Sequence, residues 1–225
     1  MNLNVAVKKV VVLDVDGVLF RNKKILSHVS NKAVKYIQDN VPNFTEFHAA
    51  YYFNNMIYKS YGHTARGLSI IYNNPYEIRD FNEYIYNSSM IDELKSHLVK
   101  NVTEIKNIKK ELVPLLNHCK ENDISIYLLS NAPSEWCVEI SDVLSLHIPF
   151  TNIITSDWIL FNHRLKPDRG LYNDVYNYIE FKEKEKVFIY YIDDSEINLH
   201  PLKYSNDWKP ILFKDNFKNV MNYIN

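Results

Sequence analysis

Two aspartates at the end of an apolar run are the first feature that suggests chemistry. Asp14 lies near the end of the run Lys9 to Val15, and Asp16 and Gly17 follow it. Because side chains alternate along a strand, both carboxylates point to the same side, and the glycine permits a sharp turn. Carboxylates so placed repel each other unless a cation or a shared proton lies between them. The pair taken alone is also compatible with a solvated turn.

Three further groups of polar residues follow later strand-like runs in the same way. They are Ser130 with Asn131, Lys166 directly before Pro167, and Asp193 with Asp194 and Asn198. Open parallel sheets bind ligands in the crevice beyond the carboxyl ends of their strands. Because all four groups occur where such strands are predicted to end or just beyond them, we expect the groups to meet in one site.

The elements that would position these residues alternate between strands and helices. The five expected strands are Lys9 to Val15, Ile124 to Leu129, Asn152 to Thr155, Val187 to Ile192 and Ile211 to Phe213. Apolar residues recur at helical spacing between the later strands, from Leu112 to Cys119, Val138 to Leu144 and Tyr172 to Ile179. This alternation predicts an α/β fold, a Rossmann-like three-layer core with a parallel sheet.

A long segment after the first strand breaks the alternation. Residues 21–110 contain several helix-length patterns and no convincing strand. We therefore expect an α-helical cap domain at 21–110, inserted into a core domain formed by 1–20 and 111–225. Such a cap would cover the mouth of the sheet.

The four motifs, in this order, resemble those of the haloacid-dehalogenase (HAD) superfamily along essentially the whole chain. The resemblance implies the sheet order 3-2-1-4-5 and makes Asp14 a nucleophile that forms an aspartyl-phosphate. It implies that Asp16 protonates the leaving oxygen and then deprotonates the attacking water. Ser130, Asn131 and Lys166 would hold the phosphoryl oxygens.

A cation is expected in the same site. A carboxylate that attacks a phosphate anion needs one, and a cluster of hard oxygen ligands suits Mg²⁺. The expected ligands are the carboxylates of Asp14 and Asp194 and the backbone carbonyl of Asp16, with Asp193 acting mainly through a metal-bound water. The sequence leaves open which residue of the Asp193–Asp194 pair binds directly. Dehalogenation is disfavoured, because a halide leaving group needs no acid such as Asp16.

The cap segment Tyr58 to Leu68, with the sequence YKSYGHTARGL, narrows the expected substrate. It is similar to the cap of the pyrimidine 5′-nucleotidase branch, which implies hydrolysis of nucleoside 5′-monophosphates such as UMP or CMP. Arg66 is the expected cap contact to a phosphate or base carbonyl, the alternative being a solvated cation at a helix end. His63 is expected to be a packing or surface residue. The tyrosines are expected in the cap core rather than stacked on a base; they are Tyr51, Tyr52, Tyr58 and Tyr61.

The sequence therefore predicts a Mg²⁺-dependent phosphatase for small phosphorylated metabolites, with nucleoside 5′-monophosphates first. Two alternatives remain open: a sugar-phosphate phosphatase or phosphomutase on the same fold, and a non-catalytic binding module. No nucleic-acid polymer is expected as a partner, because a cap of this size leaves little room for a macromolecule.

Composition sets broader limits. The 225 residues carry 26 Lys and Arg against 27 Asp and Glu, which argues against a broadly basic nucleic-acid surface. Two cysteines, Cys119 and Cys137, are too few for a disulfide framework. No apolar run approaches the ~18 residues of a membrane span. We expect no membrane partner and a cytoplasmic protein, and nothing in the sequence indicates an oligomeric state.

Overall fold

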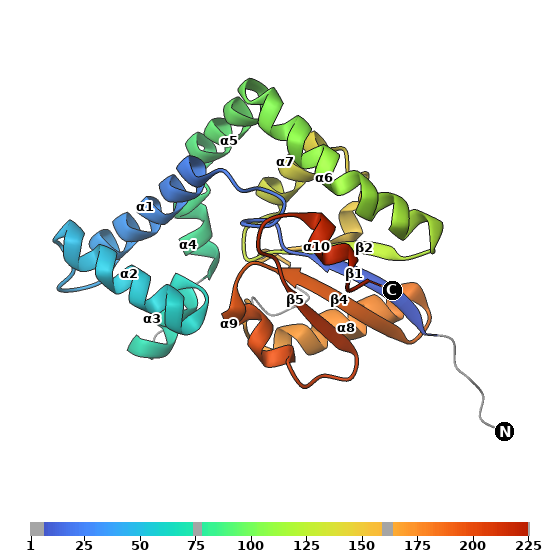
Figure 1. Cartoon of the computed structure of the whole chain (residues 1–225). Coiled ribbons are helices and arrows are strands. Elements are labelled where there is room, and N and C mark those ends of the chain that lie inside the picture. The colour runs from blue at the N-terminus through green and yellow to red at the C-terminus, as the bar shows by residue number, and fades with distance from the viewer. Residues whose placement is uncertain (1–6, 74–77, 159–163, 225) are drawn as a thin grey trace.

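The computed structural model describes residues 7–73, 78–158 and 164–224. Five parallel strands form one sheet in the order β3-β2-β1-β4-β5. They are β1 (Lys8–Leu13), β2 (Ser125–Leu129), β3 (Ile153–Ile154), β4 (Val187–Asp193) and β5 (Trp208–Leu212). The predicted fold class and strand order are confirmed. The two strands that carry Asp14 and Asp193 at their carboxyl ends, β1 and β4, are neighbours at the centre of the sheet (Figure 1).

The last strand begins earlier than predicted. We expected Ile211 to Phe213, whereas β5 starts at Trp208 and includes Pro210. A proline lacks the N–H that an interior strand needs for pairing on both sides. Because β5 pairs only with β4 at the edge of the sheet, Pro210 is tolerated there.

Helices cover both faces of the sheet and also form a separate group after β1 (Figure 1). The longer helices are α1 (Lys23–Asn40), α2 (Phe47–Tyr61), α3 (Thr64–Tyr72), α4 (Ile78–Ile85), α5 (Ser88–Lys100), α6 (Val102–Glu121), α7 (Ser134–Leu144) and α8 (Arg169–Glu183). The shorter ones are α9 (Glu196–Leu199), α10 (Phe217–Met221) and the 3-10 turns η1 (Phe150–Asn152) and η3 (His200–Leu202).

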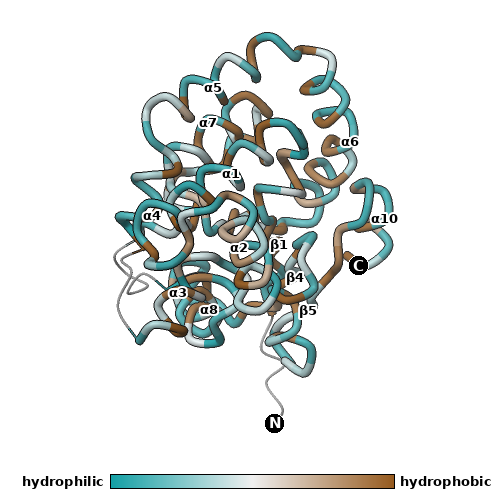
Figure 2. Tube along the Cα trace, turned by 90° about the vertical axis from the view of Figure 1, so that its left-hand side faces the viewer, coloured by the Kyte–Doolittle hydropathy of each residue, from teal (hydrophilic) through white to brown (hydrophobic). Residues whose placement is uncertain are grey.

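The alternation of side chains along β1 divides the core into two layers. Val11 and Leu13 pack in one cluster with residues of α5, α6, α7 and α10. Val10 and Val12 point to the other face and pack with α8 and the α9–η3 segment. These parallel strands are buried on both faces, which explains their nearly continuous apolar runs. The helices that cover the sheet are instead amphipathic. Along α5 and α6, hydrophobic and hydrophilic residues alternate (Figure 2).

A third apolar cluster lies among α1, α2, α3 and α4, and its members run from Ala33 to Ile85. The following helix, α5, packs instead with the sheet through Met90 and Leu94. Helix α6 is continuous from Val102 to Glu121, so it passes through the expected boundary at residue 110. The division into a core and a cap at 21–110 stays a prediction; below, "cap" denotes α1–α4 and their connections. None of the helices in the described ranges is long and apolar enough to cross a bilayer.

Candidate active site

Asp14 is the first residue beyond β1, and its carboxylate is firmly held. Its backbone N–H donates to the carbonyl of Ile192, so the residue continues the pairing of β1 with β4. The side-chain Oδ1 accepts a hydrogen bond from the Val15 N–H at 2.6 Å and forms an ion pair with Lys166 Nζ at 2.7 Å. Asp14 is only 5% exposed. One oxygen is thus anchored, and Oδ2 is left for other chemistry.

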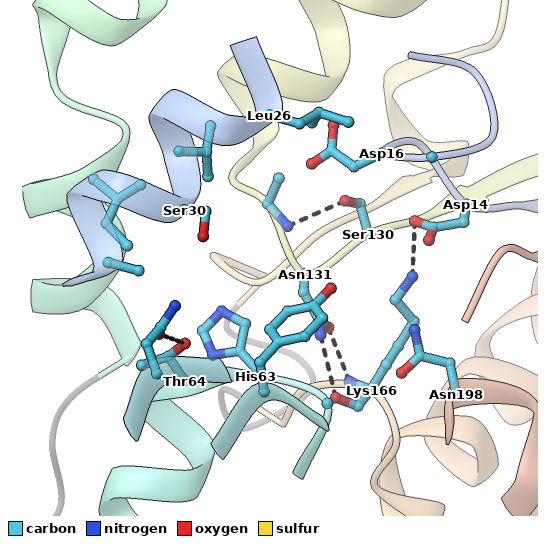
Figure 3. Close-up of a pocket in the computed structure, with 18 of the residues that line it drawn as sticks. Asp14, Asp16, Leu26, Ser30, His63, Thr64, Ser130, Asn131, Lys166 and Asn198 are labelled. Atoms are coloured by element: carbon cyan, nitrogen blue, oxygen red, sulfur yellow. Dashed lines mark hydrogen bonds and ion pairs between the residues drawn. The ribbon is translucent and has the colours of Figure 1, made fainter. Parts of the chain in front are cut away.

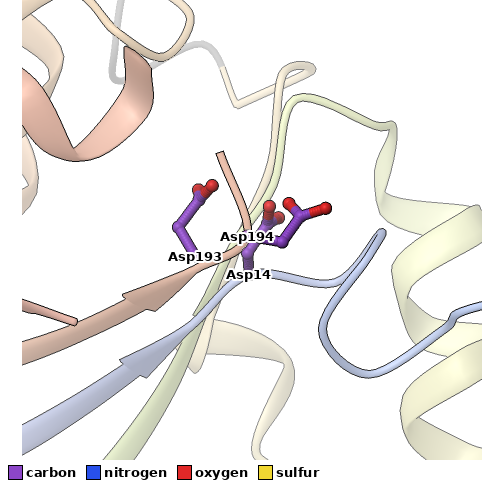
Figure 4. Close-up of side chains that lie close together, drawn as sticks. All are labelled: Asp14, Asp193 and Asp194. Atoms are coloured by element: carbon purple, nitrogen blue, oxygen red, sulfur yellow. The ribbon is translucent and has the colours of Figure 1, made fainter. Parts of the chain in front are cut away.

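Asp14, Asp193 and Asp194 form an acidic cluster, in which one carboxylate oxygen of each lies within 4.8 Å of the others (Figure 4). Lys166 is the one cation that the described structure pairs with this cluster, so three carboxylates face one ammonium. Burial and the charge of Asp193 raise the pKa of Asp14 well above its usual range. The same two causes raise the pKa of Asp194. The cluster therefore has an excess of negative charge that a cation would relieve.

The two neighbouring aspartates differ in what surrounds them. Asp193 is fully buried, and its oxygens accept hydrogen bonds from Lys166 Nζ (2.9 Å), the Ser195 N–H (2.8 Å), Asn198 Nδ2 (3.1 Å) and the Tyr191 hydroxyl. Burial alone would raise the pKa of Asp193, but these donors hold it below the usual range. Asp194 is exposed and lines the cavity. Asp194 is thus the better-placed ligand of the pair.

Gly17 allows the loop after β1 to pass close to Asp194. A Cβ at position 17 would lie 2.0 Å from Asp194 Oδ2, and the glycine has a φ of +84°. Any other residue would be strained there and would displace the carboxylate. The loop closes through a hydrogen bond from the Gly17 N–H to the Phe20 carbonyl at 2.8 Å.

Asp16 is oriented by a buried tryptophan of α7. The indole Nε1 of Trp136 donates to Asp16 Oδ1 at 2.9 Å. Trp136 is fully buried and packs edge-on against Phe20 and Tyr86, at centroid distances of 5.8 Å and 5.1 Å. Desolvation raises the pKa of Asp16 to about 6, even though the indole hydrogen bond and Lys166 act in the opposite direction. A carboxyl with such a pKa is suited to exchange protons near neutral pH.

Asn131 positions the lysine rather than pointing freely into the cavity. Its Oδ1 accepts from the Lys166 N–H at 2.8 Å, and its Nδ2 donates to the Lys166 carbonyl at 3.2 Å. The Ser130 Oγ accepts from the Ala132 N–H at 3.1 Å, which fixes the side chain in the cavity wall. Lys166 is 2% exposed, and the charges of Asp14 and Asp193 raise its pKa although burial alone would lower it. It stays protonated.

These residues lie at one end of a cavity of about 400 Å³ between the sheet and the cap. Figure 3 shows Asp14, Asp16, Ser130 and Lys166 on one side of it, with Ser30, His63 and Thr64 on the other. The volume is within the range of about 300–1,000 Å³ that is common for small-molecule sites. Leu26, Tyr58, Phe81 and Tyr86 are among the other lining residues.

The structure brings most of the predicted site residues together. The six that line the cavity are Asp14, Asp16, Ser130, Asn131, Lys166 and Asp194, and Asp193 lies directly behind them. Arg66 does not line the cavity; its Nη1 donates to the Tyr61 carbonyl at 3.1 Å. Its contact with substrate stays a prediction.

Expectations for the cap aromatic residues need correction. Tyr61 packs against the cap cluster as predicted. Tyr51 and Tyr52 are 39% and 73% exposed, because they lie on the outer face of α2. Tyr58 lines the cavity. His63 is buried and packs against Phe81, in agreement with the expected packing role, and it also lines the cavity.

Sequence reasoning missed Trp136 and Tyr86. Each is a single aromatic residue in a helical or inter-helical segment. Only the folded chain brings Trp136 to Asp16, and Tyr86 to Trp136 and the cavity wall. Gly62 lies in the cap segment Tyr58 to Leu68. It ends α2 with a φ of +75°, and a Cβ there would lie 2.6 Å from Pro167 Cδ.

The cluster is chemically suited to a hard divalent cation. All its donors are oxygens, its charge is in excess, and the exposed Asp194 carboxylate faces the cavity. Soft metals prefer thiolate or imidazole ligands. The one candidate cluster among the described residues contains neither cysteine nor histidine.

No protein-family model matches the chain, and no curated protein matches it. Two solved structures are similar over most of their length. A phosphoserine phosphohydrolase-like protein from Francisella tularensis is 16% identical with a TM-score of 0.49, over 96% of this chain and 92% of that one. A HAD family enzyme from Bacteroides thetaiotaomicron is 13% identical with a TM-score of 0.46, over 96% and 99%. Both TM-scores are below 0.5, so neither structure supports an argument about the function of this chain.

Proposed function

We propose that the protein is a phosphatase that hydrolyses small phosphomonoesters through a phosphorylated Asp14. The observation that carries this proposal is the pairing of a held carboxylate with a second carboxyl of raised pKa. Asp14 Oδ1 is fixed by the Val15 N–H and Lys166, and Asp16 faces the same cavity with a pKa of about 6. A nucleophile and an acid–base group in one cavity are the minimum for two-step transfer.

In the first step, Asp14 Oδ2 attacks phosphorus and the bond to the leaving oxygen breaks. The protonated Asp16 gives its proton to that oxygen, so the alcohol leaves neutral. Lys166 and the Ser130 hydroxyl donate to the phosphoryl oxygens and offset their charge.

In the second step, the Asp16 carboxylate takes a proton from a water molecule that attacks the same phosphorus. The bond from phosphorus to Asp14 breaks, and Asp14 returns as a carboxylate. One ester and one water are consumed, and one alcohol and one phosphate are released. Trp136 keeps Asp16 oriented in both steps.

A divalent cation, with Mg²⁺ as the expected one, would be held by the carboxylates of Asp14 and Asp194 and the Asp16 carbonyl. When bound it would neutralise the excess negative charge and stabilise charge on the phosphoryl group. In this proposal Asp193 does not bind it directly, because its oxygens already accept several hydrogen bonds. Asp193 instead positions Lys166 and Asn198.

For the substrate we propose a nucleoside 5′-monophosphate. The cap segment Tyr58 to Leu68 supports this choice by its similarity to pyrimidine 5′-nucleotidases. Four residues of the segment, Tyr58, Gly62, His63 and Thr64, line the cavity. Tyr58 offers an aromatic face on which a base could stack.

The test is phosphate release from UMP, CMP, AMP, GMP, their deoxy forms and common sugar phosphates. Each is assayed with Mg²⁺, with EDTA, and with the Asp14→Asn variant. We expect turnover that is lost with EDTA and reduced at least about 10³-fold by Asp14→Asn, because an amide is a poor nucleophile. Asp142→Asn, an exposed position on α7, is the matched control.

Unchanged phosphate release from Asp14→Asn would overturn the catalytic proposal. Asp14-dependent turnover that favours hexose phosphates over every nucleotide would keep the mechanism and replace the substrate. Absence of turnover for all of these esters would favour a binding module.

A further inference from the structure

The two ends of the cavity differ in charge. The charged side chains among the described lining residues are Asp14, Asp16, Lys166 and Asp194, and all of them belong to the sheet end. The cap contributes polar residues without formal charge, which are Ser30, Asn54, Asn55, Tyr58, His63 and Thr64. Arg66, three positions after His63, does not line the cavity, and its guanidinium donates to the Tyr61 carbonyl.

His63 is the most constrained of these cap residues. Its side chain is buried, and its Nδ1 has no hydrogen-bond partner among the residues that the structure describes. The ring packs edge-on against Phe81 at 5.2 Å. Burial, with a smaller contribution from Arg66 and Lys166, lowers the pKa of His63 to about 3. A neutral imidazole offers one N–H donor and one acceptor, and a buried polar atom without a partner favours a ligand that supplies one.

Asn54 is fixed by a hydrogen bond from Thr64, the residue that follows His63. The Thr64 hydroxyl donates to Asn54 Oδ1 at 2.7 Å, and both residues are buried. This bond fixes the amide and leaves its Nδ2 as a donor. Ser30, on α1, lies on the same side of the cavity as His63 and Thr64 (Figure 3).

We propose that Ser30, Asn54 and His63 form a subsite for the leaving group, and that this subsite selects an uncharged, hydrogen-bonding alcohol. Hydroxyl, amide or imide groups both donate and accept, as these three residues do. A carboxylate or ammonium on the leaving group would lose its hydration with no opposite charge among the described side chains that line this end of the cavity. This inference rests on the proposed function and names the substrate class of the same site.

Matched pairs of substrates test the selection directly. Glycerol 3-phosphate and 3-phosphoglycerate differ by a hydroxymethyl against a carboxylate. 2-Hydroxyethyl phosphate and phosphoethanolamine differ by a hydroxyl against an ammonium. We expect kcat/KM to be at least about 100-fold higher for the uncharged member of each pair, since an unpaired buried charge is strongly disfavoured.

Variants at position 63 test the residue. His63→Phe removes the polar atoms and keeps a ring, and we expect it to lower kcat/KM for UMP about tenfold more than for phenyl phosphate, whose leaving group has no hydrogen-bonding substituent. His63→Gln restores a donor and an acceptor and should recover part of the loss. His48→Phe, on the exposed face of α2, is the control and should leave the ratio unchanged. Thermal unfolding and circular dichroism verify that each variant is folded.

The outcomes separate this inference from the proposed function. Asp14-dependent turnover with equal or better use of the charged members overturns the subsite alone. So does an equal loss for UMP and phenyl phosphate in folded His63→Phe. Turnover that does not depend on Asp14 overturns the proposed function and this inference with it.

Discussion

The sheet end and the cap end of the cavity are built on different principles. At the sheet end, Asp14 and Asp193 are fixed by several short contacts each, and their charges are coupled through Lys166. At the cap end, His63 and Asn54 keep hydrogen-bonding capacity that the described protein does not use fully. The comparison indicates that one end is organised before any ligand arrives, whereas the other is completed by the ligand.

The supporting elements explain this difference. The sheet end rests on β1 and β4, which pair along their length in the middle of the sheet. Charges held on such a rigid base need no rearrangement during reaction, which is the basis of electrostatic preorganisation. The cap end rests on α1, α2 and the turn into α3, which have their own small apolar cluster. Changes at the sheet end should therefore affect the chemical step and stability together, and changes at the cap end should affect mainly binding.

The largest effect is expected from Lys166→Met. It removes the cation between Asp14 and Asp193 and leaves buried carboxylates unpaired, which should destabilise the fold by about 3–5 kcal/mol and lower kcat at least about 10³-fold. Urea unfolding and phosphate release measure the two effects. The double variant with Asp193→Asn should regain stability without regaining activity. A stable, active Lys166→Met protein would contradict the preorganised sheet end.

An intermediate effect is expected from Asp16→Asn in metal-free protein. Unlike Lys166→Met, this substitution should stabilise the fold. The folded-state pKa of Asp16 is about 6 against a usual 3.8, so the folded protein binds this proton more tightly than the unfolded chain. Wild-type stability should therefore fall as the pH rises from 4 to 6, and the amide variant escapes this loss. We expect the variant to be about 1–2 kcal/mol more stable than the wild type at pH 7 and equally stable at pH 4. This free energy is smaller than the full pKa shift would give, because Asp16 is partly exposed and solvent screens its charge.

Chemical denaturation at both pH values in EDTA measures this difference, with Asp142→Asn as control. An equal gain at pH 4 and pH 7 would mean that ionisation of Asp16 is not the cause. The same variant should lose turnover of alkyl phosphates more than turnover of p-nitrophenyl phosphate, whose leaving group needs no acid.

The smallest effect is expected at the cap end, from Thr64→Val. The substitution keeps the shape and removes the hydroxyl that holds Asn54 Oδ1. We expect KM for UMP to rise about fivefold, as for one hydrogen bond of about 1 kcal/mol, with a smaller change in kcat. Steady-state kinetics measure both values. A larger effect on kcat than on KM would contradict the division between the two ends.

The sequence was sufficient to predict the part of the site that lies on strands. Strands buried on both faces have continuous apolar runs, so their carboxyl ends, and the polar residues just beyond them, can be located without a structure. This is why Asp14, Asp16, Ser130 and Asp194 were predicted and lie together. The fold class was likewise predictable from the alternation of strands and helices, and the strand order was implied by the resemblance of the four motifs to the HAD superfamily.

The cap end and the packing around Asp16 were not predictable in this way. Helical periodicity identifies a buried face without indicating what that face will contact, so the packing of His63 was predicted but its place in the cavity wall was not. Trp136 contacts Asp16 across 120 positions of sequence, and no local pattern encodes such a contact. The start of β5 was not predicted, because a proline such as Pro210 argues against a strand. It is compatible with an edge strand, and the sequence alone does not show that β5 lies at the edge of the sheet.

The glycine at position 62 allows the cap to come close to the loop that carries Lys166 and Pro167. With no Cβ, the end of α2 settles against Pro167, next to the lysine that Asn131 holds from the other side. A methyl group at position 62 would collide with Pro167 and hold the cap away from the loop that carries Lys166.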